Sequence, residues 1–194
     1  MLQKYNKNLN LSRKSFIKIL SKTKIFRTFV SLLIRCKFTT MKIGVFAGSF
    51  DPITKGHEDI VLQALPLFDE IIIAIGVNID KKYAFPLEKR INWIENTFAE
   101  YPKVKVISYE GLTVDLCKKM NAGFIIRGLR NTTDFEYESI IAEANKKLNP
   151  EVETIFFLSN PNLRCISSTV VRDLIKNGAD LKGFIPEKSG FYEK

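Results

Sequence analysis

The stretch GSFDPITKGHEDI, residues 48–60, places residues suited to phosphate chemistry at close spacing. It contains the only histidine of the chain, His57, directly after a loop with two glycines, a proline and two hydroxyl side chains. A helix that begins here would direct its free backbone N–H groups and the positive end of its dipole toward the loop, and both favour an anion. The stretch matches neither the P-loop nor the dinucleotide-binding glycine pattern. It therefore predicts an anion-binding loop of another kind, with His57 at its edge.

Two later segments offer further groups for an anion. Arg127 ends the apolar run FIIR, and a planar guanidinium can hold a phosphate through two parallel hydrogen bonds. Ser167, Ser168 and Thr169 come at the expected start of the last helix, where hydroxyls and backbone N–H groups form a second candidate anion site. Simple N-capping by these hydroxyls is the alternative, and the two roles are compatible.

The elements that must position these groups follow from an alternation of apolar and amphipathic segments along residues 41–194. We expect strands at 42–48, 70–77, 103–108, 124–127 and 153–158. We expect helices at about 57–68, 87–101, 113–120, 134–148 and 168–177. This order predicts an α/β fold with a doubly wound, five-stranded parallel sheet, which is Rossmann-like. Ligands of such sheets bind beyond the carboxyl ends of the strands, where the candidate loops lie.

The charge of the chain is unevenly distributed. Ten of its 30 basic residues lie in residues 1–40, which contain no Asp or Glu, so residues 41–194 keep 20 basic side chains against 21 acidic ones. The body is thus near neutral, which argues against nucleic-acid binding as its main role despite the overall charge of +9. The three cysteines form no C-x-x-C pair, and with one histidine they predict neither a disulfide framework nor a zinc site. A reducing compartment fits this composition.

Residues 1–40 are expected to be a basic N-terminal extension outside the fold, and residues 41–194 the functional domain. Three interpretations stay open: a true start at Met41, a targeting segment, or a basic arm for nucleic acid or a membrane surface. The apolar run TFVSLLI is far shorter than the ~20 residues that span a bilayer. We therefore expect no membrane anchor and a cytoplasmic location, or an organelle if the extension is a transit peptide.

Three motifs resemble, closely and in order, those of one family. GSFDPITKGH (48–57) is similar to the strand-loop-helix signature of the nucleotidyltransferase superfamily, whose [HT]-x-G-H element is matched by Thr54 to His57. IIRGLRNTTDFEYE (125–138) and ISSTVVR (166–172) are similar to the bacterial phosphopantetheine adenylyltransferase family within it. The resemblance covers essentially all of residues 41–194. It implies that the adenylyl group of ATP is transferred to 4′-phosphopantetheine, giving dephospho-coenzyme A and pyrophosphate.

The resemblance also implies roles for single residues. His57 would be the catalytic residue that stabilises charge on the α-phosphate, and no general base is required because an ionised phosphate is already a nucleophile. The implied ATP-binding residues are Ser49, Phe50, His57, Gly128, Leu129, Arg130, Glu138, Leu163, Arg164, Cys165, Ile166, Ser167, Ser168 and Thr169. The implied substrate-binding residues are Ser49, Lys81, Thr113 and Arg127, with Ser49 standing where the family usually has threonine. For Lys81 and Glu138, a solvated position on the surface is the alternative.

The partners implied by the resemblance are ATP and 4′-phosphopantetheine, together with further copies of the chain, a hexamer in the family. Mg²⁺ would be a counter-charge that can arrive with ATP, so that few protein ligands are needed; no residue is predicted as a metal ligand. Rival readings are a nicotinate or nicotinamide mononucleotide adenylyltransferase, a cytidylyltransferase, or a relative that binds without catalysis. RGLRNTTDFEYE and the short chain argue against the first two, and the intact set of His57, Lys81, Arg127 and Arg130 argues against the third.

Overall fold

A computed structural model of the chain describes residues 41–78 and 80–192. The chain divides into the units Met1–Thr40 and Met41–Lys194, and the fold described is that of the second unit. The expectation of a basic extension over residues 1–40 falls outside the described residues. No helix within the described ranges is both long enough and apolar enough to cross a membrane.

Five parallel strands form one sheet, and they run in the order β3-β2-β1-β4-β5 across it. The strands are β1 (Ile43–Gly48), β2 (Glu70–Gly76), β3 (Val104–Tyr109), β4 (Phe124–Leu129) and β5 (Glu153–Leu158). The winding direction reverses between β1 and β4, so the loops after these two strands part and leave a crevice at the carboxyl edge. The doubly wound five-stranded parallel sheet that the sequence predicts is confirmed.

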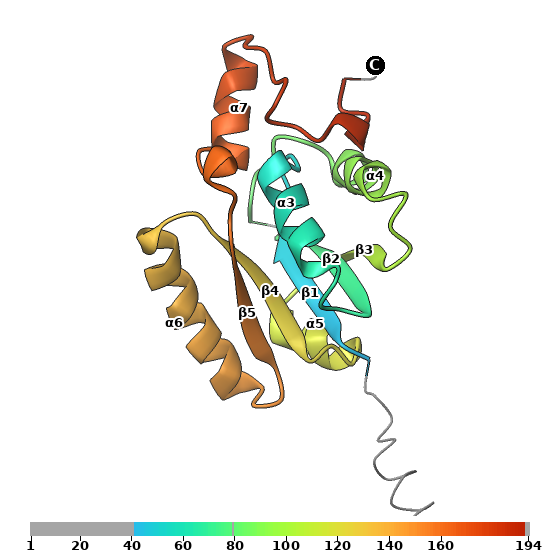
Figure 1. Cartoon of the computed structure of the whole chain (residues 1–194), viewed down its shortest axis with the longest axis vertical. Helices are drawn as coiled ribbons and strands as arrows, with labels where there is room; N and C mark the ends of the chain where they lie inside the picture. The colour runs from blue at the N-terminus through green and yellow to red at the C-terminus, as the bar shows by residue number, and fades with distance from the viewer. Residues whose placement is uncertain (1–40, 79, 193–194) are drawn as a thin grey trace, which may run out of the picture. The chain divides into compact units, whose positions relative to one another are not determined.

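Helices cover both faces of the sheet (Figure 1). They are α3 (Lys55–Ala64), α4 (Leu87–Thr97), α5 (Thr113–Lys119), α6 (Thr132–Leu148) and α7 (Ser168–Lys176), with short 3₁₀ turns η2 (Pro161–Leu163) and η3 (Glu187–Ser189). Successive side chains of β1 point to opposite faces: Phe46 joins the cluster under α3 and α4, and Val45 joins the cluster under α5. Because β1 and β2 are covered on both faces, they are apolar almost throughout.

The C-terminal segment, residues 177–192, packs back against α3 and α4. The carbonyl of Phe184 accepts a hydrogen bond from the backbone N–H of Lys55 at 2.8 Å, next to the start of α3. Phe191 lies 4.6 Å from Trp93 of α4, ring centroid to centroid, and Trp93 lies 5.0 Å from Phe85 in the β2–α4 loop. The segment therefore joins the start of α3 to α4 and to the loop that precedes α4.

Three boundaries of α3 and α4 differ from the expected ones for physical reasons. Helix α3 begins at Lys55, two residues before His57, because Thr54 caps it, and it ends at Ala64, because Pro66 has no N–H to continue the ladder. Helix α4 ends at Thr97 rather than at 101, since the chain leaves the helix at Phe98, whose ring is buried. Strand β4 continues two residues past 127, to Leu129, and pairs with β5 there.

Candidate active site

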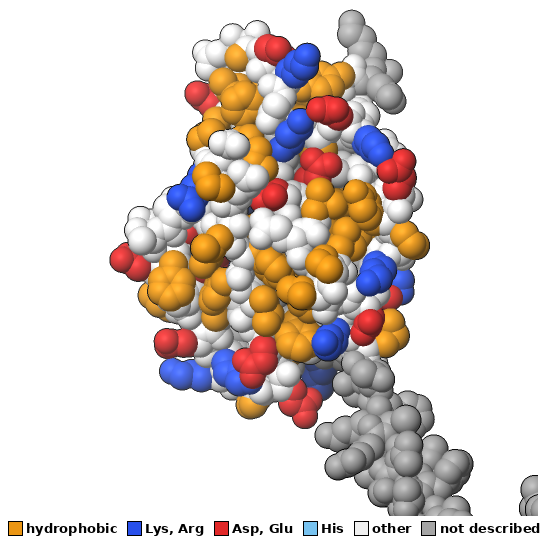
Figure 2. Space-filling model, in the orientation of Figure 1, with side chains coloured by type: hydrophobic (Ala, Val, Ile, Leu, Met, Phe, Trp, Pro, Cys, Tyr) orange, Lys and Arg blue, Asp and Glu red, His pale blue; other side chains and the backbone are white. Residues whose placement is uncertain are grey.

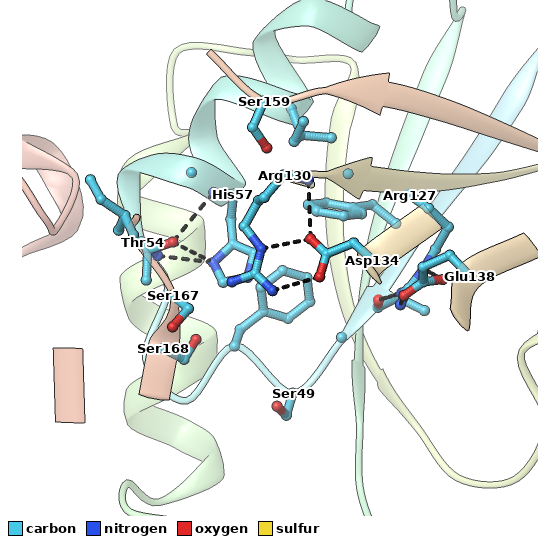
Figure 3. A pocket seen from close by; sticks show the side chains of 18 residues that line it. Ser49, Thr54, His57, Arg127, Arg130, Asp134, Glu138, Ser159, Ser167 and Ser168 are labelled. Carbon is cyan, nitrogen blue, oxygen red and sulfur yellow. Dashed lines mark hydrogen bonds and ion pairs between the residues drawn. The ribbon is translucent and has the colours of Figure 1, made fainter. Parts of the chain in front are cut away.

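A cavity of about 330 Å³ lies where the strand order reverses, beyond the ends of β1 and β4 (Figure 3). The β1–α3 loop, the end of β4, the first turns of α6 and the start of α7 all contribute to its lining. Ten of its lining residues are among those implied by the resemblance: Ser49, Phe50, His57, Arg127, Gly128, Arg130, Glu138, Ile166, Ser167 and Ser168. The structure thus brings most of the predicted site together at the edge of the sheet where the fold predicts it.

The tautomer of His57 is set by the cap of its own helix. His57 is the third residue of α3, and the backbone N–H of Thr54 donates to its Nδ1 at 3.0 Å. The Thr54 hydroxyl lies 3.0 Å from the same nitrogen and accepts from the backbone N–H of His57, which completes a capping box. Because Nδ1 accepts from a backbone N–H, the ring proton of the neutral imidazole lies on Nε2. His57 therefore holds an N–H donor available to an anion in the cavity.

Aromatic rings and nearby cations keep this imidazole neutral. Phe50 packs edge-on against it at 5.0 Å, and Phe46 lies at 6.1 Å. Phe50 itself is buried and has a φ of 44°, in the left-handed region, so the loop holds it in a conformation that non-glycine residues rarely adopt. Burial, followed by the charges of Arg130 and Arg127, lowers the pKa of His57 to about 4. At neutral pH the residue is an uncharged donor.

Both arginines of the cavity are held by carboxylates from α6. Arg127 donates from Nε to Glu138 at 2.7 Å and also pairs with it through Nη2, while its Nη1 donates to the carbonyl of Ala47 at 2.7 Å. Arg130 donates to Asp134 from Nε at 2.8 Å and from Nη2 at 3.0 Å. The Glu138 side chain is only 12% exposed, so the alternative of a solvated surface carboxylate is wrong.

Gly128 lies in the cavity for a packing reason that sequence reasoning did not anticipate. A Cβ at this position would lie 2.8 Å from Cγ1 of Ile60, on the buried face of α3. The missing side chain therefore lets α3 approach β4 closely, and this brings His57 near the arginines. Leu129, the next residue, is buried beside the cavity rather than in its lining.

The start of α7 supplies hydroxyls, but only part of the predicted segment reaches the cavity. Ser167 caps α7 by accepting from the backbone N–H of Val170 at 3.2 Å, and Ser168 donates to the carbonyl of Pro52 at 2.8 Å. Capping and cavity lining thus occur together. Besides Leu129, four predicted ATP-binding residues lie outside the lining, and all but the first of them are exposed: Leu163, Arg164, Cys165 and Thr169.

Lys81 and Thr113 also lie outside this cavity. Lys81 is exposed in a shallow hollow after β2, with its Nζ 5.6 Å from the ring centre of Tyr83. Thr113, at the start of α5, shares a 2.8 Å hydrogen bond with the hydroxyl of Tyr109. The loops after β2 and β3, which carry these two residues, still lie at the same carboxyl edge of the sheet as the β1–α3 loop.

Buried polar groups join the Lys81 loop to the His57 loop. The Asp51 carboxylate accepts from the backbone N–H groups of Ala84 and Phe85 at 2.8 and 3.0 Å. The buried guanidinium of Arg90 donates to the carbonyls of Ser49 and Phe85 at 2.7 and 3.1 Å. These bonds fix the β2–α4 loop against the β1–α3 loop.

Three polar side chains of the cavity lining were missed by sequence reasoning: Thr54 as the group that orients the imidazole, Asp134 as the partner of Arg130, and Ser159. The spacing of Arg130 and Asp134, four residues apart, was a signal for an ion pair. Ser159 follows β5 and carried no comparable signal. Among the described residues, no group of three His, Cys, Asp or Glu side chains is placed to hold a metal ion.

Comparison with known proteins places the chain in a family. A model of the cytidylyltransferase-like family matches residues 45–174. Over 147 residues, or 76% of the chain, the sequence is 56% identical to the phosphopantetheine adenylyltransferase of Flavobacterium psychrophilum, covering 97% of that protein. The protein of the same name from Bacteroides thetaiotaomicron is 47% identical over the same length, with 97% of it covered.

Solved structures agree on the fold. A bifunctional NMN adenylyltransferase/ADP ribose pyrophosphatase from Francisella tularensis superposes with a TM-score of 0.59 at 20% identity, over 77% of this chain and 46% of that one. At that identity the match concerns the Rossmann-like architecture alone. The family follows from the sequence relatives and the family model together: this chain belongs to the phosphopantetheine adenylyltransferases, nucleotidyltransferases with a cytidylyltransferase-like domain.

Proposed function

We propose that the cavity works by positioning and electrostatic stabilisation, without a covalent intermediate, as the chain transfers the adenylyl group of ATP to 4′-phosphopantetheine. One observation carries this mechanism: a neutral Nε2–H donor on His57 and two carboxylate-held arginines converge at the switch point of the sheet. Such fixed donors act on charge as it develops, and they need no reorganisation during the reaction.

The reaction needs little proton chemistry from the protein. An oxygen of the acceptor phosphate attacks the α-phosphorus of ATP, the bond from that phosphorus to the bridging oxygen breaks, and pyrophosphate leaves with the electron pair. His57 donates from Nε2 to an α-phosphate oxygen in the transition state. Arg130, with Ser167 and Ser168, receives the β- and γ-phosphates. Arg127 receives the acceptor phosphate. Glu138 holds Arg127, and it is also assigned to ATP binding, as the resemblance implies.

The residues outside the cavity complete the proposed site. We assign Lys81 to the acceptor phosphate and Thr113 to the pantetheine arm, because their loops border the same edge of the sheet. The segment from Leu163 to Cys165 and Thr169 would contact the nucleotide beyond the cavity lining. Removing residues 1–40 should leave turnover within about twofold, since each of these residues lies in the second unit. A cytoplasmic location for this enzyme remains our expectation.

Mg²⁺ is expected to be carried by ATP rather than by the protein. The two carboxylates nearest the cavity, Asp134 and Glu138, both face arginines, and the described residues hold no cluster of ligating side chains. The ion supplies positive charge to the phosphate oxygens when it is bound. Arg127 and Arg130 are the residues of this chain that share that task.

We also propose that the chain assembles with copies of itself through α6 and β5. Helix α6 has 17 residues and none of them is buried, and Phe135 and Ile140 are 51% and 67% exposed. Leu158 at the end of the edge strand β5 is 69% exposed, and hydrophobic side chains gather on this face (Figure 2). Monomers rarely leave such a face open. Ile140→Glu should lower the mass measured by light scattering, whereas an unchanged mass would contradict the use of this face.

The mechanism and the acceptor are tested together by release of pyrophosphate from ATP and Mg²⁺. We expect turnover with 4′-phosphopantetheine and at most a few per cent of it with nicotinamide mononucleotide. Rapid-quench experiments with ATP labelled in the α-phosphate should trap no labelled protein. A labelled protein intermediate would overturn direct transfer, and equal turnover with the two acceptors would overturn the acceptor assignment.

A further inference from the structure

The two arginines of the cavity are held by the same edge of their guanidinium groups. It is the side edge, which is formed by Nε and Nη2. In both, Nε and Nη2 donate to one carboxylate: Arg127 to Glu138, and Arg130 to Asp134. A guanidinium has five N–H donors, one on Nε and two on each terminal nitrogen. For Arg130 the pair uses two of them, so both N–H groups of Nη1 and one of Nη2 remain for other partners. These groups form the end edge of the guanidinium.

We propose that Asp134 is a positioning residue for nucleotide binding: it fixes the side edge of Arg130 and so presents the end edge to the ATP phosphates. The inference rests on the proposed role of Arg130 at the β- and γ-phosphates. Asp134 lines the same cavity and lies beside Arg130 in Figure 3. It acts through the arginine, without contact to the nucleotide.

Asp134 is itself held in place by the start of α6. It is the third residue of that helix, and its backbone N–H donates to the side-chain oxygen of the capping residue Asn131 at 2.8 Å. Its Oδ2 also accepts from the backbone N–H of Arg130 at 3.0 Å. One carboxylate therefore fixes the main chain and the side chain of Arg130. The hydrogen bonds from Arg130 lower the pKa of Asp134, so the carboxylate stays ionised at neutral pH.

A contribution to stability alone explains this arrangement poorly. The Arg130 side chain is 37% exposed, and ion pairs at that exposure add little to the stability of a fold. Arginine has many rotamers, and binding must otherwise restrict them when the phosphate arrives. An arginine that is already held in the empty site avoids this loss of side-chain entropy on binding. Because Arg130 is assigned to the ATP phosphates, the holding should raise the affinity for ATP and leave the affinity for the acceptor unchanged.

The test is steady-state kinetics of the full chain carrying Asp134→Asn. We expect KM for ATP to rise about 10-fold, with KM for 4′-phosphopantetheine within about twofold of the unaltered chain. Asp115→Asn is the matched control: Asp115 is the third residue of α5, is exposed, and has no ion pair among the described residues. It loses the same charge at the same helix position, so it should change neither constant. Equal rises in both KM values, or the same change in the control, would overturn the proposal.

A double-mutant cycle with Arg130→Gln separates this inference from the function on which it rests. If Asp134 acts through Arg130, Asp134→Asn should change KM for ATP less than twofold in the Arg130→Gln background. Additive effects would overturn the positioning role and leave the role of Arg130 intact. An unchanged KM for ATP in Arg130→Gln alone would refute the proposed role of that arginine. If Asp134→Asn does not fold, Asp134→Ser, which keeps one acceptor for the Arg130 backbone, carries the same cycle and the same criteria.

Discussion

Helices α3 and α6 both supply the candidate site, but the protein supports them in opposite ways. Helix α3 buries Ile60, Val61 and Ala64 against the sheet, whereas the 17-residue α6 buries no residue. His57 on α3 is oriented by the cap of its own helix, while Asp134 and Glu138 on α6 form ion pairs with arginines in β4 and in the loop after it. The comparison indicates that the donor on one side of the cavity is fixed within its own helix, whereas the donors on the other side are fixed by ion pairs with α6.

The largest effect is expected when the donor that is fixed within α3 is removed. His57→Ala should lower kcat by about 10²–10³, because the lost donor acts on charge that develops in the transition state, and ATP affinity should change much less. Single-turnover rates measure the chemical step, and equilibrium binding measures the affinity for ATP. An equal loss in ATP binding, with an intact rate for the bound complex, would make His57 a ligand holder instead.

The contact that brings α3 to β4 can be tested through stability. Gly128→Ala places a methyl group 2.8 Å from Cγ1 of Ile60 and should lower the free energy of unfolding by about 2 kcal/mol. Gly123→Ala is the control, because a Cβ there meets nothing within 4 Å. Urea titration of both variants measures the difference. Adding Ile60→Ala to Gly128→Ala should cost less than the two single losses combined, and strict additivity would show that the methyl group finds other space.

The side of the cavity that is fixed by ion pairs should respond through substrate affinity. Arg127→Lys keeps the positive charge but loses the forked geometry, and it leaves Glu138 without its two parallel bonds. We expect KM for 4′-phosphopantetheine to rise about 10-fold and KM for ATP to rise less. The reverse pattern in initial-rate measurements would mean that the assignments of Arg127 and Arg130 are exchanged.

The smallest effect concerns pH and the neutral state of His57. The unfolded chain takes up a proton on this residue near pH 6.5, but the folded chain does so only near its pKa of about 4. Between these values the unfolded state binds more protons, so stability is full above pH 6.5 and falls as the pH is lowered toward 4. We expect a loss of about 1 kcal/mol at pH 5.5, absent in His57→Gln.

The protonation state itself can be observed directly. Since the chain has one histidine, imidazole NMR of tag-free protein gives one set of signals. These signals should report the Nε2–H tautomer down to about pH 5 and titrate near the pKa of about 4. A titration midpoint near pH 6.5 would contradict the burial of the imidazole beside the two arginines.

Sequence reasoning succeeded where local pattern decides structure. The apolar runs at 42–48 and 70–77 predicted β1 and β2 within a residue or so, and the loop before His57 was predicted to lie beyond the carboxyl end of the first strand, as it does. Sequence reasoning was incomplete where two residues distant in the sequence contact each other only in the folded chain. The sequence around Gly128 does not show that this residue lies opposite Ile60. The acidic residues of DFEYE are typical of an exposed helix face, and only the folded sheet places Arg127 beside Glu138.

The packing of Trp93 gives the protein an intrinsic optical probe. It is the only tryptophan of the chain, and it touches both Phe85, at the end of the loop that carries Lys81, and Phe191 of the C-terminal segment. Indole emission depends on the polarity and motion of such neighbours, so stopped-flow fluorescence needs no added label to follow that loop. If Lys81 binds the acceptor as proposed, acceptor binding can then be timed on the same sample in which pyrophosphate release is timed by a coupled assay.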